Sequence, residues 1–289
     1  MRKMKTYIRQ LMFLILLFGI PFQDTYAQTI LTIADSMCIS GSAVITIHGG
    51  VVANSGGIKN NGTVFLKENP NAGIENWTNN SSSNALYGTG TVIFNSTDQQ
   101  IIDGMFPTTF SRLRINNSSV TGVNLNVNAL VSDTLYLTNG KVNTATNYMV
   151  VTNSDAASIT GYNQGATTPS FINGNLRRFI NSNSQTYGFP VGNSSAYYLS
   201  EIISSGITGV SYLDAKFSPL TNHIDADMNI TESGMEYASL CNQGVWFINP
   251  NANPTSALYS IRGYIGNFSC GLIDNEFGIL KRPDNSLSA

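Results

Sequence analysis

Charged residues are scarce in this chain of 289 residues. They make up 11% of the sequence, and the formal net charge is −2, whereas an ordinary soluble domain carries about a quarter charged residues. No basic stripe or patch is visible, so we do not expect a nucleic-acid-binding protein. Surface polarity must come largely from uncharged side chains, and the sequence has 34 asparagines. Asparagine favours tight turns, which predicts many short strands.

Histidine and cysteine are also rare, with two and three copies. Their spacing fits no zinc-binding pattern, and no serine lies in a G-x-S-x-G nucleophile motif. Exported chains permit disulfides. We therefore consider a bond between Cys241 and Cys270, with Cys38 left over, although the spacing alone does not decide between this bond and free thiols.

Long apolar runs are absent after residue 27. The run Leu11–Ile20 follows a basic start and precedes the small residue Ala27, which is the layout of a secretory signal peptide over residues 1–27. The run is short for a membrane span, so no transmembrane segment is expected after cleavage. Cleavage removes four of the 15 basic and one of the 17 acidic residues, leaving a net charge of about −5. We expect a secreted or cell-surface protein.

A repeat organises the region from residue 88 to 159. Short apolar strands end at Phe94, Ile115, Leu137 and Ile159, and the step between them is nearly constant. Repeats of this length are typical of stacked solenoid turns. Alternation along each strand predicts which side chains point inward. They are Val92 with Phe94, Leu113 with Ile115 and Leu135 with Leu137, and on another face Val123, Leu125 and Val127.

Asparagines follow three of these strands in register, at Asn95, Asn117 and Asn139. One interpretation is a ladder of stacked amides that hydrogen-bond along the solenoid axis. The other is a set of turn-forming side chains exposed to water.

The predicted fold is all-β and has two parts after the leader. Residues 28–187 are expected to form a right-handed parallel β-helix, and 188–200 a junction, where Pro190 argues against a central strand. Residues 201–289 predict a smaller antiparallel module of β-sandwich type. Its expected strands are 209–217, 244–248, 257–264 and 276–281. The chain stops soon after the last of these, which suggests that the sandwich lacks some strands.

Two tryptophans are candidate binding residues. Trp77 lies in the polar stretch 68–87, which predicts a long surface loop. Its ring is expected either to pack on the solenoid flank, as buried tryptophans do, or to be exposed for sugar stacking. Trp246 lies in the C-terminal module.

An acidic segment is a candidate calcium site. Asp225, Asp227, Asn229 and Glu236 occupy the first, third, fifth and twelfth positions of an EF-hand loop. The sixth position, which needs glycine for its sharp turn, is Ile230. The alternatives are a calcium site of another geometry and a solvated acidic loop.

The sequence resembles exported surface proteins of Bacteroidetes. The resemblance rests on "GTGTVIFNSTDQQIIDG" from Gly88, the following turns to Thr144, "GFPVG" at 188–192, the Gly-x-Trp element ending at Trp246, and Lys281-Arg282. Such proteins are adhesin-like or gliding-associated, and the type IX system often exports them. That route normally uses a C-terminal sorting domain, which we do not recognise here. The resemblance implies a β-solenoid and no catalytic residues.

We therefore expect a non-catalytic structural or adhesive surface protein that binds a glycan or another surface protein. The alternative is a carbohydrate-active enzyme, a polysaccharide lyase or hydrolase, on a β-helix scaffold. Such enzymes need clustered carboxylates. Asp133 and Asp155 are separated by one repeat step, so they are the pair that could stack in neighbouring turns.

Overall fold

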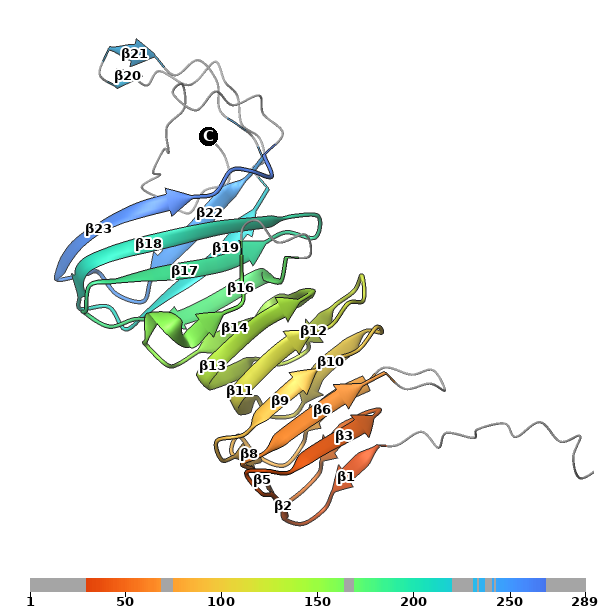
Figure 1. The fold of residues 1–289 in the computed structure, drawn as a ribbon. Helices are drawn as coiled ribbons and strands as arrows, with labels where there is room; N and C mark the ends of the chain where they lie inside the picture. Colours follow the sequence, from red (N-terminus) through yellow and green to blue (C-terminus); the bar gives the residue numbers. More distant parts are fainter. Residues whose placement is uncertain are drawn as a thin grey trace, which may run out of the picture.

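The computed structural model describes residues 30–68, 75–163, 169–219, 231–232, 234–236, 241 and 243–268. Within these residues the chain is built from β-strands and one short 3-10 helix, η1 (Ala156–Ser158). A parallel solenoid of about seven turns spans residues 31–192, and further strands form a smaller sheet portion after it (Figure 1). The predicted fold class is confirmed. The leader 1–27 lies outside the described residues, and no described helix has the length and hydropathy to cross a bilayer.

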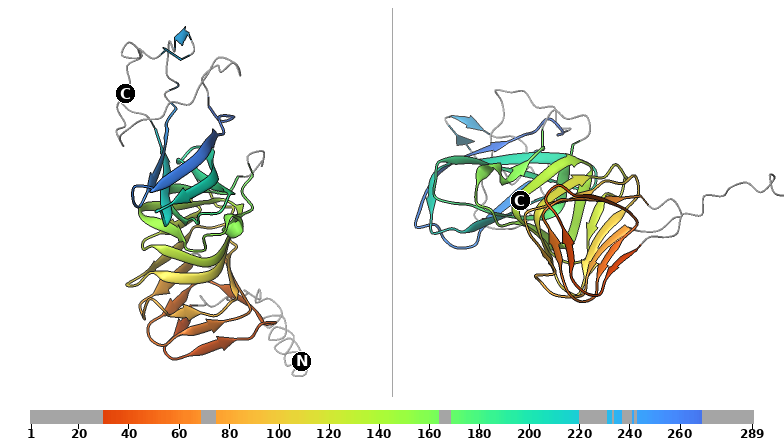
Figure 2. Two further views of the ribbon diagram at one scale, coloured as in Figure 1. Left: turned by 90° about the vertical axis from the view of Figure 1, so that its left-hand side faces the viewer. Right: turned by 60° about the horizontal axis from the view of Figure 1, so that its bottom comes forward.

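Successive turns place strands on three faces, which we name A, B and C, and strands of one face pair in parallel (Figure 2). Four strands bend around a corner and serve two faces: β11 (Thr108–Asn116), β13 (Ala129–Asn139), β14 (Lys141–Val151) and β16 (Phe171–Phe179). Face A also holds β3 (Val44–His48), β6 (Thr63–Lys67), β9 (Thr91–Phe94) and β15 (Ile159–Thr160). Face B holds β1 (Leu31–Ile33), β4 (Val51–Ala53), β7 (Glu75–Asn79), β10 (Gln100–Gly104) and β12 (Val123–Leu125). Face C holds β2 (Met37–Ile39), β5 (Ile58–Asn60) and β8 (Leu86–Tyr87).

The inward side chains of face A stack in columns, as the repeat predicts. Leu113 pairs with Val92 on one side and Leu135 on the other, and all three are essentially inaccessible to solvent. A second column joins the residues two positions further along each strand: Leu66, Phe94, Ile115 and Leu137. On face B, Val123 and Leu125 are buried as expected, and Val127 packs against the same core.

The register predicted for the last repeat is wrong. Ile159 pairs with Leu135 and not with Leu137. Gly161 lies where a partner for Leu137 was expected, and a Cβ atom there would lie 2.4 Å from the Leu137 carbonyl oxygen. The helix η1 adds residues to this turn, so the step lengthens beyond the regular repeat.

The stacked-amide interpretation of Asn95, Asn117 and Asn139 is wrong, and the alternative of side chains exposed to water is wrong at Asn117. Asn116 donates to Asn95 at 2.7 Å, so the partly exposed amide contact between these turns uses Asn116 and not Asn117. Asn117 is fully buried. Its amide donates to the Asp98 carbonyl and to Gln100, and its oxygen accepts from the backbone of Ser119. At this corner the buried side chain of Asn117 supplies hydrogen bonds that backbone pairing between strands does not make.

The solenoid continues into the antiparallel strands without a break in hydrogen bonding. β16 pairs in parallel with β14 and in antiparallel with β19 (Tyr212–Ser218). β17 (Gln185–Gly192) forms a hairpin with β18 (Tyr197–Thr208) across the region expected as a junction. Pro190 lies inside β17, but at this position the strand pairs with β18 alone, so the proline does not occupy a centrally paired position. Pairing of β17 with β16 begins only at Val191, so no pairing on that side is interrupted by the missing N–H of proline.

The remaining described strands complete two small layers. β23 (Ser256–Gly263) pairs with β18, and β22 (Val245–Pro250) pairs with β19. The rings of Tyr198 and Phe217 join the layers at a centroid distance of 3.9 Å. The predicted strand 276–281 lies outside the described residues. A separate hairpin consists of β20 (Thr231–Glu232) and β21 (Met235–Glu236).

Two adjacent arginines mark the end of the solenoid and point in opposite directions. Arg178 continues the inward column after Val151 and is fully buried. It donates to the carbonyls of Gly188 in β17 and of Ala156 in η1. Burial lowers the pKa of Arg178 below its usual value. Arg177 faces outward and forms a two-bond ion pair with Asp214, which raises the pKa of Arg177. Arg178 therefore fastens the last turn to β17.

Replacing Arg178 with methionine should destabilise the protein far more than the same change at Arg177. Methionine fills similar volume but removes the donor to the buried Gly188 carbonyl and to the part-buried Ala156 carbonyl, which we expect to cost about 2–4 kcal/mol. The outward pair of Arg177 is partly exposed, and its loss should cost about 1 kcal/mol or less. Urea unfolding of the two variants measures the difference. If Arg178→Met leaves the free energy of unfolding unchanged, the guanidinium does not fasten the solenoid to the antiparallel strands.

A second matched pair tests the corner asparagines. Asn117→Ala removes four interior hydrogen bonds and should cost about 2–3 kcal/mol. Asn116→Ala removes one partly exposed amide contact and should cost below about 1 kcal/mol. Thermal unfolding of both variants under one condition gives the comparison. Equal losses would contradict the assignment of Asn117 to the core.

Candidate binding surface

Trp77 belongs to the solenoid interior. It lies in β7, where it stacks between Val51 and Ile102 in the column of face B, and its exposed fraction is 2%. Its Nε1 donates to Thr108 at 3.2 Å, and its ring lies 5.4 Å from that of Phe110. The hypothesis of an exposed sugar-stacking ring is therefore wrong, as is the surface loop at this position. The residues next to Trp77 in β7 are polar, and the next buried residue, Asn79, is polar as well, so the sequence shows no apolar alternation that would mark Trp77 as inward.

Trp246 is half-buried in β22 and belongs to an aromatic cluster between the two layers. Its indole N–H donates to the Tyr198 carbonyl at 3.1 Å. Phe268 stacks on its ring at 5.5 Å, and Phe217 approaches edge-on. These contacts occupy the donor and one ring face, so the geometry assigns Trp246 to packing within the module.

The predicted disulfide and calcium site lie largely outside the described residues. Cys241 is disulfide-bonded, Cys38 is free and exposed, and Cys270 is not described. Of the calcium candidates, Glu236 is exposed in β21, whereas Asp225, Asp227 and Asn229 are not described. Among the described residues there is no cluster of three or more histidine, cysteine and carboxylate side chains. Both sites stay predictions.

The solenoid carboxylates that the enzymatic alternative requires have structural partners. Asp133 pairs with Arg112 at 2.7 Å. Asp155 accepts from the backbone N–H of Ala157 and caps η1. The two side chains therefore take part in an ion pair and in a helix cap.

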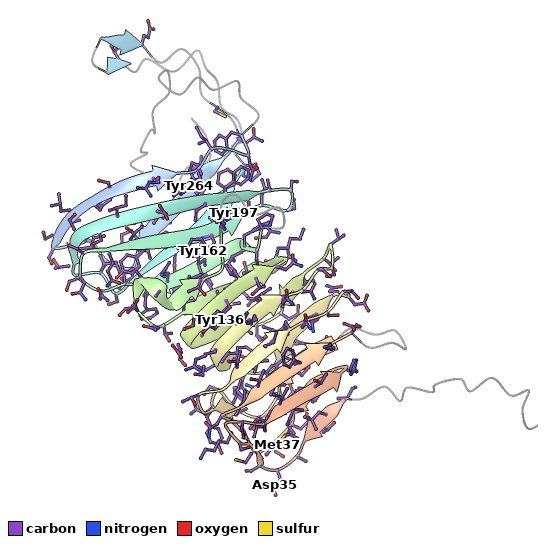
Figure 3. All side chains as sticks on the ribbon, in the orientation of Figure 1. Asp35, Met37, Tyr136, Tyr162, Tyr197 and Tyr264 are labelled. Carbon is purple, nitrogen blue, oxygen red and sulfur yellow. The ribbon has the colours of Figure 1, made fainter. Side chains whose placement is uncertain are left out.

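The outer side of face A carries a strip that the sequence reasoning missed. Phe65, Ile93, Arg114 and Tyr136 occupy one outward position in four successive turns, with paired registers throughout. We call these four residues the outer strip, and Figure 3 labels Tyr136 on its strand. The last three follow one another at the same repeat step as the inward residues. The repeat spacing therefore marks these outward positions as well as the inward positions next to them.

Arg114 gives the outer strip its electrostatic character. Its guanidinium lies 4.6 Å from the centre of the Tyr136 ring, and its buried Nε has no hydrogen-bond partner. Among the described residues Arg114 forms no ion pair, whereas Arg112 in the parallel row is neutralised by Asp133. The strip therefore combines two aromatic rings, one isoleucine that is only 9% exposed, and one cation without an acidic partner among the described residues.

Face B presents a different outer surface. Asn143 donates to Asn124 at 2.7 Å and accepts from Asn173 at 2.8 Å, which gives a true amide ladder along the axis. The amides of this ladder bond to one another and therefore join successive turns. The side-chain donors on the outer side of face A are more available to a ligand.

Comparison of the chain with protein-family models, curated proteins and solved structures found no match.

Calcium should stabilise the protein if the acidic segment binds it. For an extracellular module with a dissociation constant of about 10⁻⁴–10⁻³ M, about 10 mM calcium should add roughly 1.4–2.7 kcal/mol. That corresponds to a rise in Tm of several degrees. The double variant Asp225→Asn/Asp227→Asn should abolish the rise, and Asp98→Asn/Asp103→Asn should retain it. An unchanged melting curve at this concentration would exclude the site.

Proposed function

We propose that the protein is a non-catalytic extracellular scaffold with an adhesive role, and that its outer strip binds a glycan. The observation that carries the proposal is the in-register series Phe65, Ile93, Arg114 and Tyr136 on a parallel sheet. Three strand spacings give the strip a length of about 14 Å, which exceeds a single sugar ring. Its repeated geometry suits a chain-like ligand that runs along the solenoid axis.

The chemistry of the strip indicates the class of glycan. The exposed part of Tyr136 offers an aromatic surface for the apolar face of a sugar. Arg114 is already desolvated at Nε and lacks an acidic partner among the described residues. A guanidinium in this state favours carboxylate or sulfate groups, which accept charge-assisted hydrogen bonds. We therefore place acidic polysaccharides first among the ligands to test.

The leader supports a location outside the cytoplasm. The basic start, the apolar run Leu11–Ile20 and Ala27 favour export and cleavage before Gln28. The resemblance to exported surface proteins of Bacteroidetes extends this proposal to the cell surface and to an adhesin-like role. The occupied carboxylates Asp133 and Asp155 favour a scaffold over a lyase or hydrolase.

Substitution of the outer strip should weaken glycan binding without unfolding the protein. A screen of the exported chain on arrayed glycans should identify an acidic ligand. Tyr136→Ala and Arg114→Ala should each then lower the affinity about tenfold or more, which corresponds to about 1.4 kcal/mol. The matched control is Tyr148→Ala, because Tyr148 is an outward tyrosine on face C that also packs against an arginine.

Two results would contradict the proposal. Equal losses in Tyr136→Ala and Tyr148→Ala would show that the strip is not the site. Release of reducing ends or unsaturated sugars by the wild-type chain would assign it to the carbohydrate-active enzymes.

A further inference from the structure

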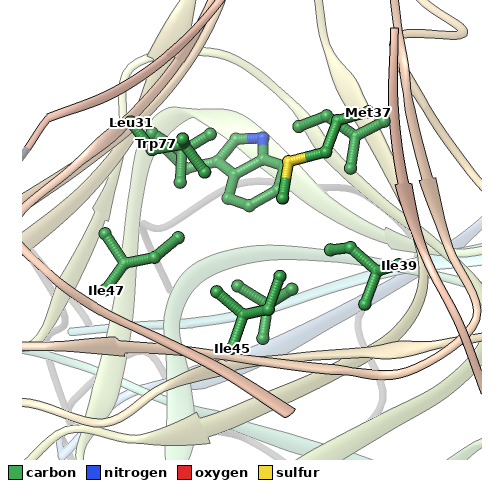
Figure 4. Close-up of a pocket in the computed structure, with 9 residues that line it drawn as sticks. Leu31, Met37, Ile39, Ile45, Ile47 and Trp77 are labelled. Carbon is green, nitrogen blue, oxygen red and sulfur yellow. The ribbon is translucent and has the colours of Figure 1, made fainter. Parts of the chain in front are cut away.

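The N-terminal end of the solenoid is open. Each of the three faces has two inward residues in the first turn. Leu31, Met37 and Ile45 are partly exposed, whereas the second residue on each face, Ile33, Ile39 and Ile47, is 3–6% exposed. The residues that stack on Leu31, Met37 and Ile45 in the next turn are almost fully buried: Val51 at 1%, Ile58 at 3% and Val64 at 2%. Figure 4 shows the apolar hollow at this end, with Trp77 two turns inside it.

The opposite end is covered. There the column continues into Arg178, which bonds to β17, and the antiparallel strands pack over the last turn. Stacked repeats need a cap at both ends, because a terminal turn cannot bury its own apolar face. The described chain supplies such a cap at one end only.

The open end also exposes three strand edges. β1, β2 and β3 each pair with the second turn, and none of them has a described partner on the other side. Free edges are usually protected by charged residues or proline. Residues 30–50 contain neither lysine nor proline, and their charged side chain at neutral pH is Asp35, which lies at the tip of the molecule in Figure 3.

The leader determines what is left to cover this end. Cleavage after Ala27 leaves Gln28, Thr29 and Ile30 ahead of β1. A full turn needs far more chain, because β2 and β3 both intervene before β4 returns to the face of β1. The short remnant therefore cannot cross all three faces. The exposure of this end therefore depends on the leader cleavage proposed above and not on glycan binding.

We propose that the open end binds a second copy of this chain, head to head. A second copy offers the same three edges and the same apolar hollow. Asp35 is the charged side chain at each of the two facing ends, so electrostatic repulsion between them is limited to this pair of carboxylates. Head-to-tail stacking is unavailable because the module covers the other end. Two-fold pairing through one surface closes after two copies and gives a dimer, not a filament.

The test is the mass in solution of the exported chain, with its N-terminus verified by mass spectrometry and with Cys38 replaced by serine so that no disulfide through this free thiol can join two copies. We expect a dimer at about 10 μM, within the range of specific protein interfaces. Thr32→Lys/Val44→Lys places charges on β1 and β3 and should raise the dimer dissociation constant at least about tenfold. The control Thr78→Lys/Thr91→Lys changes the same outward rows in the third turn and should leave the dimer unchanged.

A second unpaired strand edge could form a different dimer, and the same measurement distinguishes the two dimers. β23 is also unpaired on one side among the described strands and exposes Leu258 and Ile261 at 67% and 40%. A dimer that Leu258→Lys/Ile261→Lys disrupts, while Thr32→Lys/Val44→Lys does not, would overturn the proposal. So would a monomer at every concentration, or an exported chain that retains residues 1–27.

The free thiol of Cys38 in β2 supplies an independent distance measurement. Spin labels at this position should show a strong dipolar coupling in a head-to-head dimer, because the first turns are in contact. In a dimer through β23 the labels would be separated by two solenoid lengths of roughly 30 Å each, and the coupling would be weak.

Discussion

The stacking of inward side chains between successive turns is the constraint on which the rest of this structure depends. Leu113 shows it most plainly, because it is inaccessible to solvent only while Val92 and Leu135 lie directly beside it in the neighbouring turns. A shift of one residue would turn every such side chain outward. The same register that buries these columns aligns the outward residues into the outer strip, so the scaffold and the proposed binding surface have one origin.

Polar side chains make the hydrogen bonds within and between turns that apolar stacking cannot provide. Asn117 donates hydrogen bonds to the Asp98 carbonyl and to Gln100 at a corner of the solenoid. The Asn124–Asn143–Asn173 ladder links three turns. Arg178 carries this logic to the end of the solenoid, where its guanidinium bonds to carbonyls of η1 and β17. The low charge content of the chain follows from this arrangement, since amides and hydroxyls are short enough to bond to the adjacent turn.

The regular turns were predictable from the sequence because their spacing stays nearly constant, as with Val92, Leu113 and Leu135. The predictions from the sequence were wrong where an insertion or a single residue determines the register or the burial of a side chain. Helix η1 moved Ile159 out of register, and Trp77 is the one apolar residue of an otherwise polar strand. Arg178 could not be placed inside, because an arginine pair in a sequence usually indicates surface. Of the candidate site, the spacing of Arg114 and Tyr136 was visible, but their stacking is a property of the folded sheet.

The solenoid and the antiparallel strands should unfold as one unit, because β16 pairs with strands of both and one apolar cluster runs through them. Native-state hydrogen exchange measures this directly. Amides of β11, β13 and β18 should open with the same free energy, equal to that of global unfolding. An opening of β18 several kcal/mol below that of β11 and β13 would show two independent bodies and contradict the account.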